Sequence, residues 1–168
     1  MKRTIIFALT ILLLLLFSPI ATAVYSYKCW NAQNITLVHV KNAKWYVSNP
    51  EKIISYSTEE VINQIMWKLD TELGIESAVV VVNHVERCDI YGMAQGLFDK
   101  YGIGRDNRGL VIILAYFDRL IRTHTGKYLE SDLPDVVCAR LHREYAIPAM
   151  KENKSKCYRS SSRPLPNR

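Results

Sequence analysis

The sequence predicts an α/β protein, a three-layer α/β/α sandwich in which a small mixed β-sheet lies between helices. Two amphipathic helical patterns, at 57–74 and 89–102, alternate with two apolar runs at 78–82 and 110–115. Helices that alternate with buried strands are typical of this fold class. A third run, 120–125, alternates weakly between apolar and polar residues after a short turn, which predicts a strand that pairs back on 110–115 as a hairpin.

Both helical patterns have start and stop signals. Ser57 and Glu60 have the spacing of a capping box, and Gly74 marks the end of the first helix. Asp89 is expected to cap the second helix, which Gly102 ends. Apolar residues recur every three or four positions in each pattern. In the first helix these are Ile62, Ile65, Met66, Leu69 and Leu73.

A third helix follows the predicted hairpin. Ser131 or Asp132 is expected to cap it, with Pro134 in its first turn. Pro148 is expected to kink or end this helix because proline has no N–H to donate to the carbonyl of Glu144.

The first 23 residues read as a secretory signal peptide. Lys2 and Arg3 precede an apolar run, and the small-x-small pattern of residues 21–23 is typical of a cleavage site. The apolar run is shorter than the ~20 residues of a spanning helix, although an uncleaved anchor is the alternative interpretation. We therefore expect an exported protein, periplasmic or extracellular/lumenal. Residues 24–44 are expected to form an extended N-terminal segment.

Positive charge is concentrated at the C-terminus. The chain carries a formal net charge of +6. Residues 154–168 are rich in Ser, Arg and Pro, and we expect a basic, disordered tail. Such a tail could contact an anionic membrane. An exported protein rarely meets nucleic acid, so no nucleic-acid partner is expected.

Four cysteines leave the redox state open. Export permits disulfides, and four cysteines allow three full pairings between which the sequence does not choose. Buried free thiols are an equal alternative for Cys88 and Cys138. The full set is Cys29, Cys88, Cys138 and Cys157.

Acidic residues in two loops suggest a metal site. An antiparallel hairpin would bring the segment before 110–115 next to the segment after 120–125. Oxygen ligands gathered there would suit Ca²⁺ or Mg²⁺. The alternative interpretation makes these residues helix caps, turn formers and partners of nearby basic residues. The candidate ligands are Asp106, Asn107, Glu130, Asp132 and Asp135.

The same loops carry a family resemblance. Ordered motifs over residues 45–153 resemble the TPM domain family, named for a thylakoid-lumen protein, a photosystem II repair protein and a modulator of acetylcholine receptors. The motifs are YVSNP at 46–50, the strand at 78–82, LFDKYGIG at 97–104, NRGL at 107–110, DR at 118–119, GKYLE at 126–130, LPD at 133–135 and IP at 147–148. Two positions depart from the family pattern, Asn107-Arg108-Gly109 in place of Asp-Asn-Gly and Ser131 in place of Gly.

The resemblance implies an α/β/α sandwich outside the cytoplasm that helps membrane-protein assembly or repair. It also implies calcium binding in some members, and acid phosphatase activity has been proposed for plant members. We therefore expect a divalent-cation-binding accessory module with a membrane or envelope protein as partner. A metal-dependent phosphatase is the alternative, with Arg105, Arg108 and Lys127 as candidate phosphate contacts.

Overall fold

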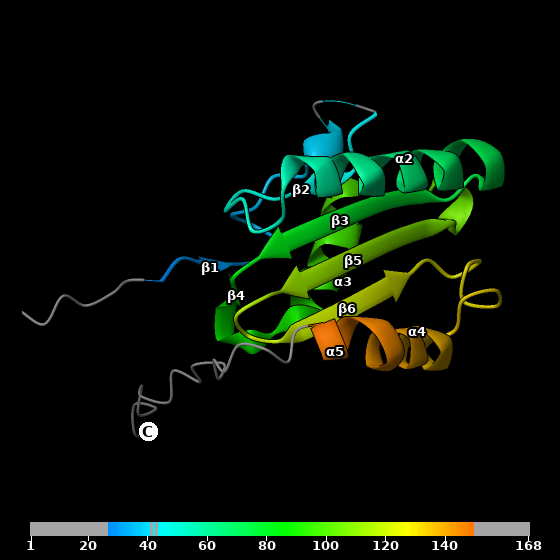
Figure 1. The fold of residues 1–168 in the computed structure, drawn as a ribbon. Helices are drawn as coiled ribbons and strands as arrows, with labels where there is room; N and C mark the ends of the chain where they lie inside the picture. The colour runs from blue at the N-terminus through cyan, green and yellow to red at the C-terminus, as the bar shows by residue number, and fades with distance from the viewer. Residues whose placement is uncertain (1–26, 41, 43, 150–168) are drawn as a thin grey trace, which may run out of the picture.

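A computed structural model describes residues 27–40, 42 and 44–149 (Figure 1). The expected signal peptide and basic tail lie outside these residues, as does Cys157. Within the described part of the chain, no helix combines the length and the hydropathy needed to cross a bilayer.

The central sheet has four strands in the order β2-β3-β5-β6. These are β2 (Val47–Ser48), β3 (Glu76–Val82), β5 (Gly109–Ala115) and β6 (Leu120–Thr125). β2, β3 and β5 run parallel, and β6 pairs antiparallel with β5. The expected mixed sheet and its terminal hairpin are therefore confirmed.

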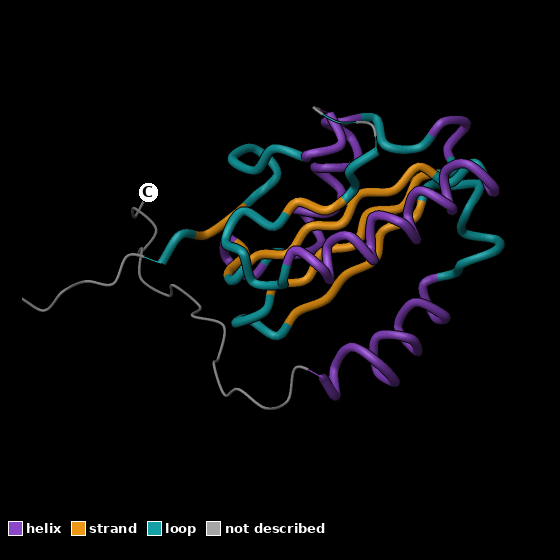
Figure 2. The backbone as a smooth tube through the Cα atoms, turned by 45° about the horizontal axis from the view of Figure 1, so that its top comes forward, coloured by secondary structure: helices purple, strands orange, loops and turns teal. Residues whose placement is uncertain are grey.

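Helices cover both faces of this sheet (Figure 2). Helix α2 (Tyr56–Leu73) packs on the face that carries Val79 and Val81, and helix α3 (Ile90–Tyr101) packs on the face that carries Val80 and Val82. Successive side chains of a strand point to opposite faces. The apolar run at 78–82 within β3 is explained by the burial of both faces, which confirms the three-layer α/β/α sandwich.

The helix ends mostly follow their sequence signals. Gly74 and Gly102 end α2 and α3 in the left-handed conformation, and the Asp89 carboxylate accepts a hydrogen bond from the backbone N–H of Gly92. The capping box is the exception, because Ser55 and not Ser57 caps α2, and its hydroxyl accepts from the N–H of Thr58. The helix starts two residues earlier than expected.

The third helix starts later than expected. Residues 127–132 form turns, and the N–H of Leu133 donates to the carbonyl of Leu129. Helix α4 (Asp135–Leu141) therefore follows Pro134 without a side-chain cap, and neither Ser131 nor Asp132 caps it. A π-helical turn, His142–Ala146, then leads into α5 (Ile147–Ala149), which contains Pro148.

The N-terminal segment contributes to the main core. Strand β1 (Cys29–Trp30) pairs in parallel with β4 (His84–Val85), and a 3-10 turn follows at Val38–Val40. The chain between them lies against α3, where the Lys100 ammonium donates to the carbonyl of Ala32 at 2.8 Å. This segment is thus an integral part of the domain. It adds Trp30, Ala32, Ile35 and Leu37 to the buried cluster on the α3 face.

The described cysteines differ in state. Cys29 and Cys138 are free thiols, with Cys138 buried. Cys88 is disulfide-bonded. The free-thiol alternative therefore holds for Cys138 and fails for Cys88.

Candidate functional site

The two acidic loops meet as the hairpin predicts. The N–H of Gly126 donates to the carbonyl of Gly109 at 2.9 Å, and the N–H of Tyr128 donates to the carbonyl of Asn107 at 3.3 Å. A Cβ on Gly126 would lie 2.3 Å from the same Asn107 carbonyl oxygen. A glycine at this position is what allows the two loops to approach so closely.

The five candidate ligands occupy this rim in two different ways. Asp106 and Asn107 are exposed residues of a short 3-10 turn, with left-handed φ angles of 53° and 59°, and Glu130 is also exposed. Asp132 and Asp135 instead face basic groups. Asp132 lies 3.8 Å from the Arg108 guanidinium, and Asp135 lies 3.4 Å from that of Arg122.

The oxygen donors of the rim have the chemistry of a hard-cation site but not its assembled geometry. Carboxylate and amide oxygens are the ligands that Ca²⁺ and Mg²⁺ take. Among the residues that the structure describes, however, no three His, Cys, Asp or Glu side chains are grouped closely enough to hold a metal ion. Binding of a cation by all five residues would require Asp132 and Asp135 to leave their arginines.

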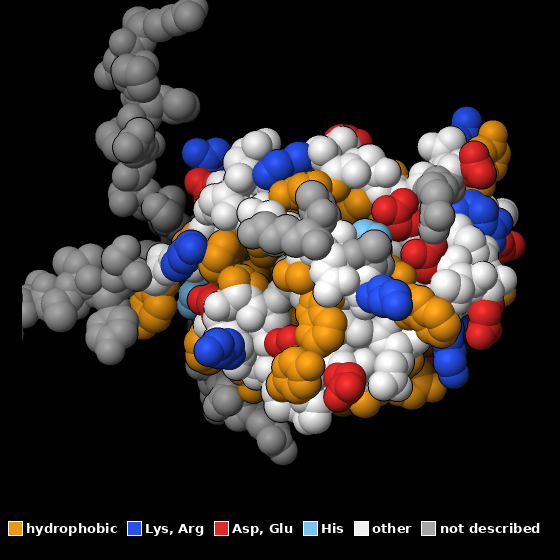
Figure 3. Space-filling view, turned by 90° about the horizontal axis from the view of Figure 1, so that it is seen from above, with side chains coloured by type: hydrophobic (Ala, Val, Ile, Leu, Met, Phe, Trp, Pro, Cys, Tyr) orange, Lys and Arg blue, Asp and Glu red, His pale blue; other side chains and the backbone are white. Residues whose placement is uncertain are grey.

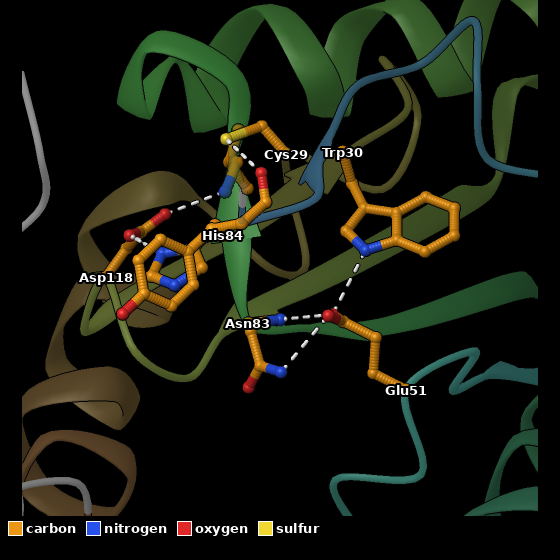
Figure 4. Close-up of polar contacts among 8 residues, drawn as sticks. Cys29, Trp30, Glu51, Asn83, His84 and Asp118 are labelled. Carbon is orange, nitrogen blue, oxygen red and sulfur yellow. Dashed lines mark hydrogen bonds and ion pairs between the residues drawn. The ribbon is translucent and has the colours of Figure 1, made fainter. Parts of the chain in front are cut away.

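A second polar cluster lies at the opposite end of the sheet, where the parallel strands have their carboxyl ends (Figure 4). Glu51 follows β2, Asn83 and His84 follow β3, and Asp118 follows β5. In open α/β sheets, ligands commonly bind outside this edge. Polar residues placed directly after apolar strands were the sequence signal for this cluster, but strand β2 is too short to be recognised from periodicity.

Glu51 fastens three parts of the chain together. Its carboxylate accepts hydrogen bonds from the N–H of Asn83 at 2.7 Å, from the side-chain amide of Asn83 at 3.1 Å and from the indole N–H of Trp30 at 3.0 Å. The contacts join the loop after β2, the end of β3 and the N-terminal segment. They leave this carboxylate with little capacity for a ligand.

Asp118 is likewise occupied by the protein. It is 6% exposed, and its carboxylate accepts from the N–H of Val85 at 2.7 Å and contacts Nδ1 of His84 at 2.8 Å. A buried carboxylate that accepts such bonds holds the ring and the backbone of β4 in place. The His84–Asp118 pair therefore joins the turn after β5 to the start of the α3 connection.

Cys29 lies beside this pair, since it is in register with His84 across the β1–β4 ladder. Burial, and then the nearby carboxylates of Asp118, Glu86 and Glu51, raise the pKa of the Cys29 thiol. Its sulfur lies 3.9 Å from the carbonyl of Tyr27. A nucleophilic cysteine needs a lowered pKa, so this Cys–His–Asp arrangement does not have the electrostatics of an activated thiol.

Comparisons with known proteins agree with the fold. Residues 47–157 match the family model described as the TPM domain. One similar structure is the N-terminal domain of a protein from P. gingivalis, with 24% identity, a TM-score of 0.68, and coverage of 73% of this chain and 79% of that chain. Another is the N-terminal domain of cg2496 protein from Corynebacterium glutamicum, with 18% identity, a TM-score of 0.54, and coverage of 62% and 68%. A comparison with curated proteins finds no match.

Proposed function

Because this chain belongs to the TPM domain family, we propose that it is an exported accessory module that binds a divalent cation and serves envelope or membrane-protein maintenance. The cation is bound at the rim formed by residues 105–108 and 126–135. Its partner is a membrane or envelope protein, and the basic tail adds a weak contact with anionic lipid.

The meeting of the two loops is the observation that supports this proposal. The Tyr128–Asn107 hydrogen bond holds the Glu130 loop beside the turn that carries Asp106. All three candidate oxygen donors of this part of the rim, Asp106, Asn107 and Glu130, are exposed to solvent. A hard cation that retains several waters needs only a few such protein ligands, which makes this a site for weak, reversible binding.

The test is a titration of Ca²⁺ and Mg²⁺ into the metal-free protein, followed by thermal unfolding. A ligand that binds only the folded state adds RT ln(1 + [L]/Kd) to the free energy of unfolding, so the melting temperature should rise with metal concentration. Glu130→Gln should abolish the rise. The matched control is Glu72→Gln on the exposed side of α2, which should leave it unchanged. An equal metal response in both variants would rule out the rim as the site.

A metal-dependent phosphatase is the second candidate, favoured by the position of Arg108 next to Asp132 in the same rim. A guanidinium beside a bound cation could contact a phosphate, and the cation would supply an activated water. Hydrolysis of p-nitrophenyl phosphate that requires metal and is lost in Arg108→Met would support this candidate. If the protein binds metal but hydrolyses no phosphate ester, the phosphatase candidate fails and the non-catalytic accessory module remains.

Export is tested separately by the mass of the secreted protein. Cleavage after Ala23 would give a mature chain that starts at Val24. A chain recovered with its first 23 residues intact would contradict the signal-peptide interpretation.

A further inference from the structure

An indole-lined groove lies beside α2, and none of its lining residues belongs to either cluster described above. Its volume is about 270 Å³, and we call it the Trp45–Trp67 groove. Figure 3 shows the molecule from above, where apolar side chains lie next to charged ones. The lining residues are Lys44, Trp45, Glu60, Asn63, Gln64 and Trp67.

Asn63 lines this groove and has a hydrogen-bond donor that no group of the described protein uses. The residue is 5% exposed, and its Oδ1 accepts from the backbone N–H groups of Tyr46 at 2.7 Å and Val47 at 3.1 Å. These two donors fix the orientation of the amide, so the remaining atom is the NH₂ group. That nitrogen is buried without a hydrogen-bond partner. Buried donors are nearly always paired, which suggests that an acceptor atom of a ligand belongs here.

Two indole rings give the groove its apolar surface. Trp67 is 46% exposed although tryptophan is usually well buried. Trp45 is half-buried and held by stacking on Tyr56, with 5.8 Å between ring centroids and 29° between planes. A ring held in this way loses little freedom when a ligand stacks on it.

The polar lining narrows the class of ligand. Glu60 and Lys44 carry opposite charges, so the lining has no net charge to favour a cation or an anion, and a purely apolar ligand would leave the Asn63 NH₂ group unpaired. Gln64 adds a further amide, so donors and acceptors are both present. The ligand that fits is neutral, carries several groups that donate and accept hydrogen bonds, and has an apolar face for the indoles.

We propose that the Trp45–Trp67 groove binds a neutral saccharide ring, free or as a unit of a polysaccharide. The C–H face of a pyranose stacks on an indole, and its hydroxyl groups both donate to Glu60 and accept from Asn63 and Gln64. The groove volume suits one such ring rather than a drug-sized ligand. This site is independent of the proposed cation rim, and binding requires no metal.

The experiment uses ¹⁵N-labelled protein in EDTA and follows three signals, the side-chain amide of Asn63 and the indole N–H groups of Trp45 and Trp67. The probes are glucose, N-acetylglucosamine, and the hexamers of the cello-, malto- and chito- series, with an unrelated neutral peptide as comparison. A saturable shift of all three signals with a saccharide supports the proposal. Binding of a monosaccharide would indicate a free sugar as the ligand. Binding of a hexamer alone would indicate a unit of a polysaccharide.

Three variants complete the test. Trp67→Ala should weaken binding at least about tenfold through loss of the stacking surface. Asn63→Asp keeps the acceptor for both backbone N–H groups but removes the free donor, and should weaken binding about fivefold. Tyr145→Ala removes a 70% exposed aromatic ring elsewhere and should change nothing. The proposal is overturned if no saccharide shifts the three signals, if Trp67→Ala binds as well as Tyr145→Ala, or if only the peptide binds.

Discussion

Replacement of Asp118 by Ala should destabilise the fold more than any other carboxylate substitution considered above. The carboxylate is 6% exposed and serves two partners, the N–H of Val85 and Nδ1 of His84. Val85 is 3% exposed, so its N–H would lose its acceptor in a place that water scarcely reaches. An unsatisfied buried donor costs about 1–3 kcal/mol, and loss of a hydrogen bond to a charged group such as this carboxylate typically costs about 1.5–3 kcal/mol. We expect a loss of about 3–4 kcal/mol in the free energy of unfolding.

Two further substitutions calibrate this value. Asp118→Asn keeps an oxygen for the Val85 N–H, and its NH₂ group could donate to Nδ1 of His84 in the other ring tautomer, so we expect a loss of only about 1–2 kcal/mol. Asp135→Ala removes an ion pair with Arg122 whose acidic side chain is 69% exposed. Exposed pairs contribute about 0–1 kcal/mol.

Equilibrium unfolding in urea at neutral pH, followed by tryptophan fluorescence, measures all three changes. The expected order of destabilisation is Asp118→Ala, then Asp118→Asn, then Asp135→Ala. If Asp118→Ala costs no more than Asp135→Ala, the carboxylate does not hold β4 in place. Its pairing with His84 would then need a functional explanation.

Three other predictions concern pH, thiols and the loop contact. Burial and a neighbouring positive charge lower the pKa of His124 and His142 below 6.5 in the folded state, so the unfolded chain binds more protons below that pH. The contribution of these two histidines to the free energy of unfolding should therefore be complete above pH 6.5 and should be lost as the pH falls toward their folded-state pKa values. In a variant with both histidines replaced by Gln, the urea midpoint should depend less on pH between about pH 7.5 and 5.5. Partial burial, with nearby carboxylates, raises the pKa of the Cys29 thiol, and burial raises the pKa of the Cys138 thiol. Both thiols should therefore react with iodoacetamide more slowly than free cysteine, and a mass-spectrometric time course should show the more exposed Cys29 modified first. Gly126→Ala would place a Cβ 2.3 Å from a backbone carbonyl oxygen and should cost about 1–3 kcal/mol in urea unfolding; an unchanged midpoint would contradict the close contact.

The elements with strong local signals were predictable from sequence. Continuous apolar runs make up most of β3 and all of β5, and α2 and α3 end at glycines whose left-handed φ angles other residues rarely adopt. Position within an element was harder to predict. Ser55 and Ser57 both have the chemistry of a cap, and the choice between them depends on where the preceding loop leaves β2.

The N-terminal segment shows why local patterns were insufficient. Trp30, Ile35 and Leu37 are buried, but they lie in a nearly irregular chain without a helical or strand period. Their burial arises from contact with α3, about sixty residues away in sequence. No periodicity argument could reveal such a contact.

The candidate sites likewise include contacts that could be predicted from the sequence and contacts that could not. The meeting of residues 107 and 128 follows from hairpin geometry, which the sequence signalled. The pairing of Asp132 with Arg108 depends on side-chain direction in irregular loops, so the sequence left caps, counter-charges and metal ligands equally open. The contacts of Glu51 required knowledge of β2, a strand of two residues.

The attachment of the N-terminal segment to α3 also sets an order of events during synthesis. Trp30 leaves the ribosome about sixty residues before Ile90, the first residue of the helix that covers it. Strand β1 likewise emerges long before its only partner, β4, in the described sheet. The apolar residues of the N-terminal segment therefore remain exposed to solvent until most of the chain has been made. Exposed apolar surface of this kind is what holdase chaperones bind. The N-terminal segment can be buried only after α3 has emerged.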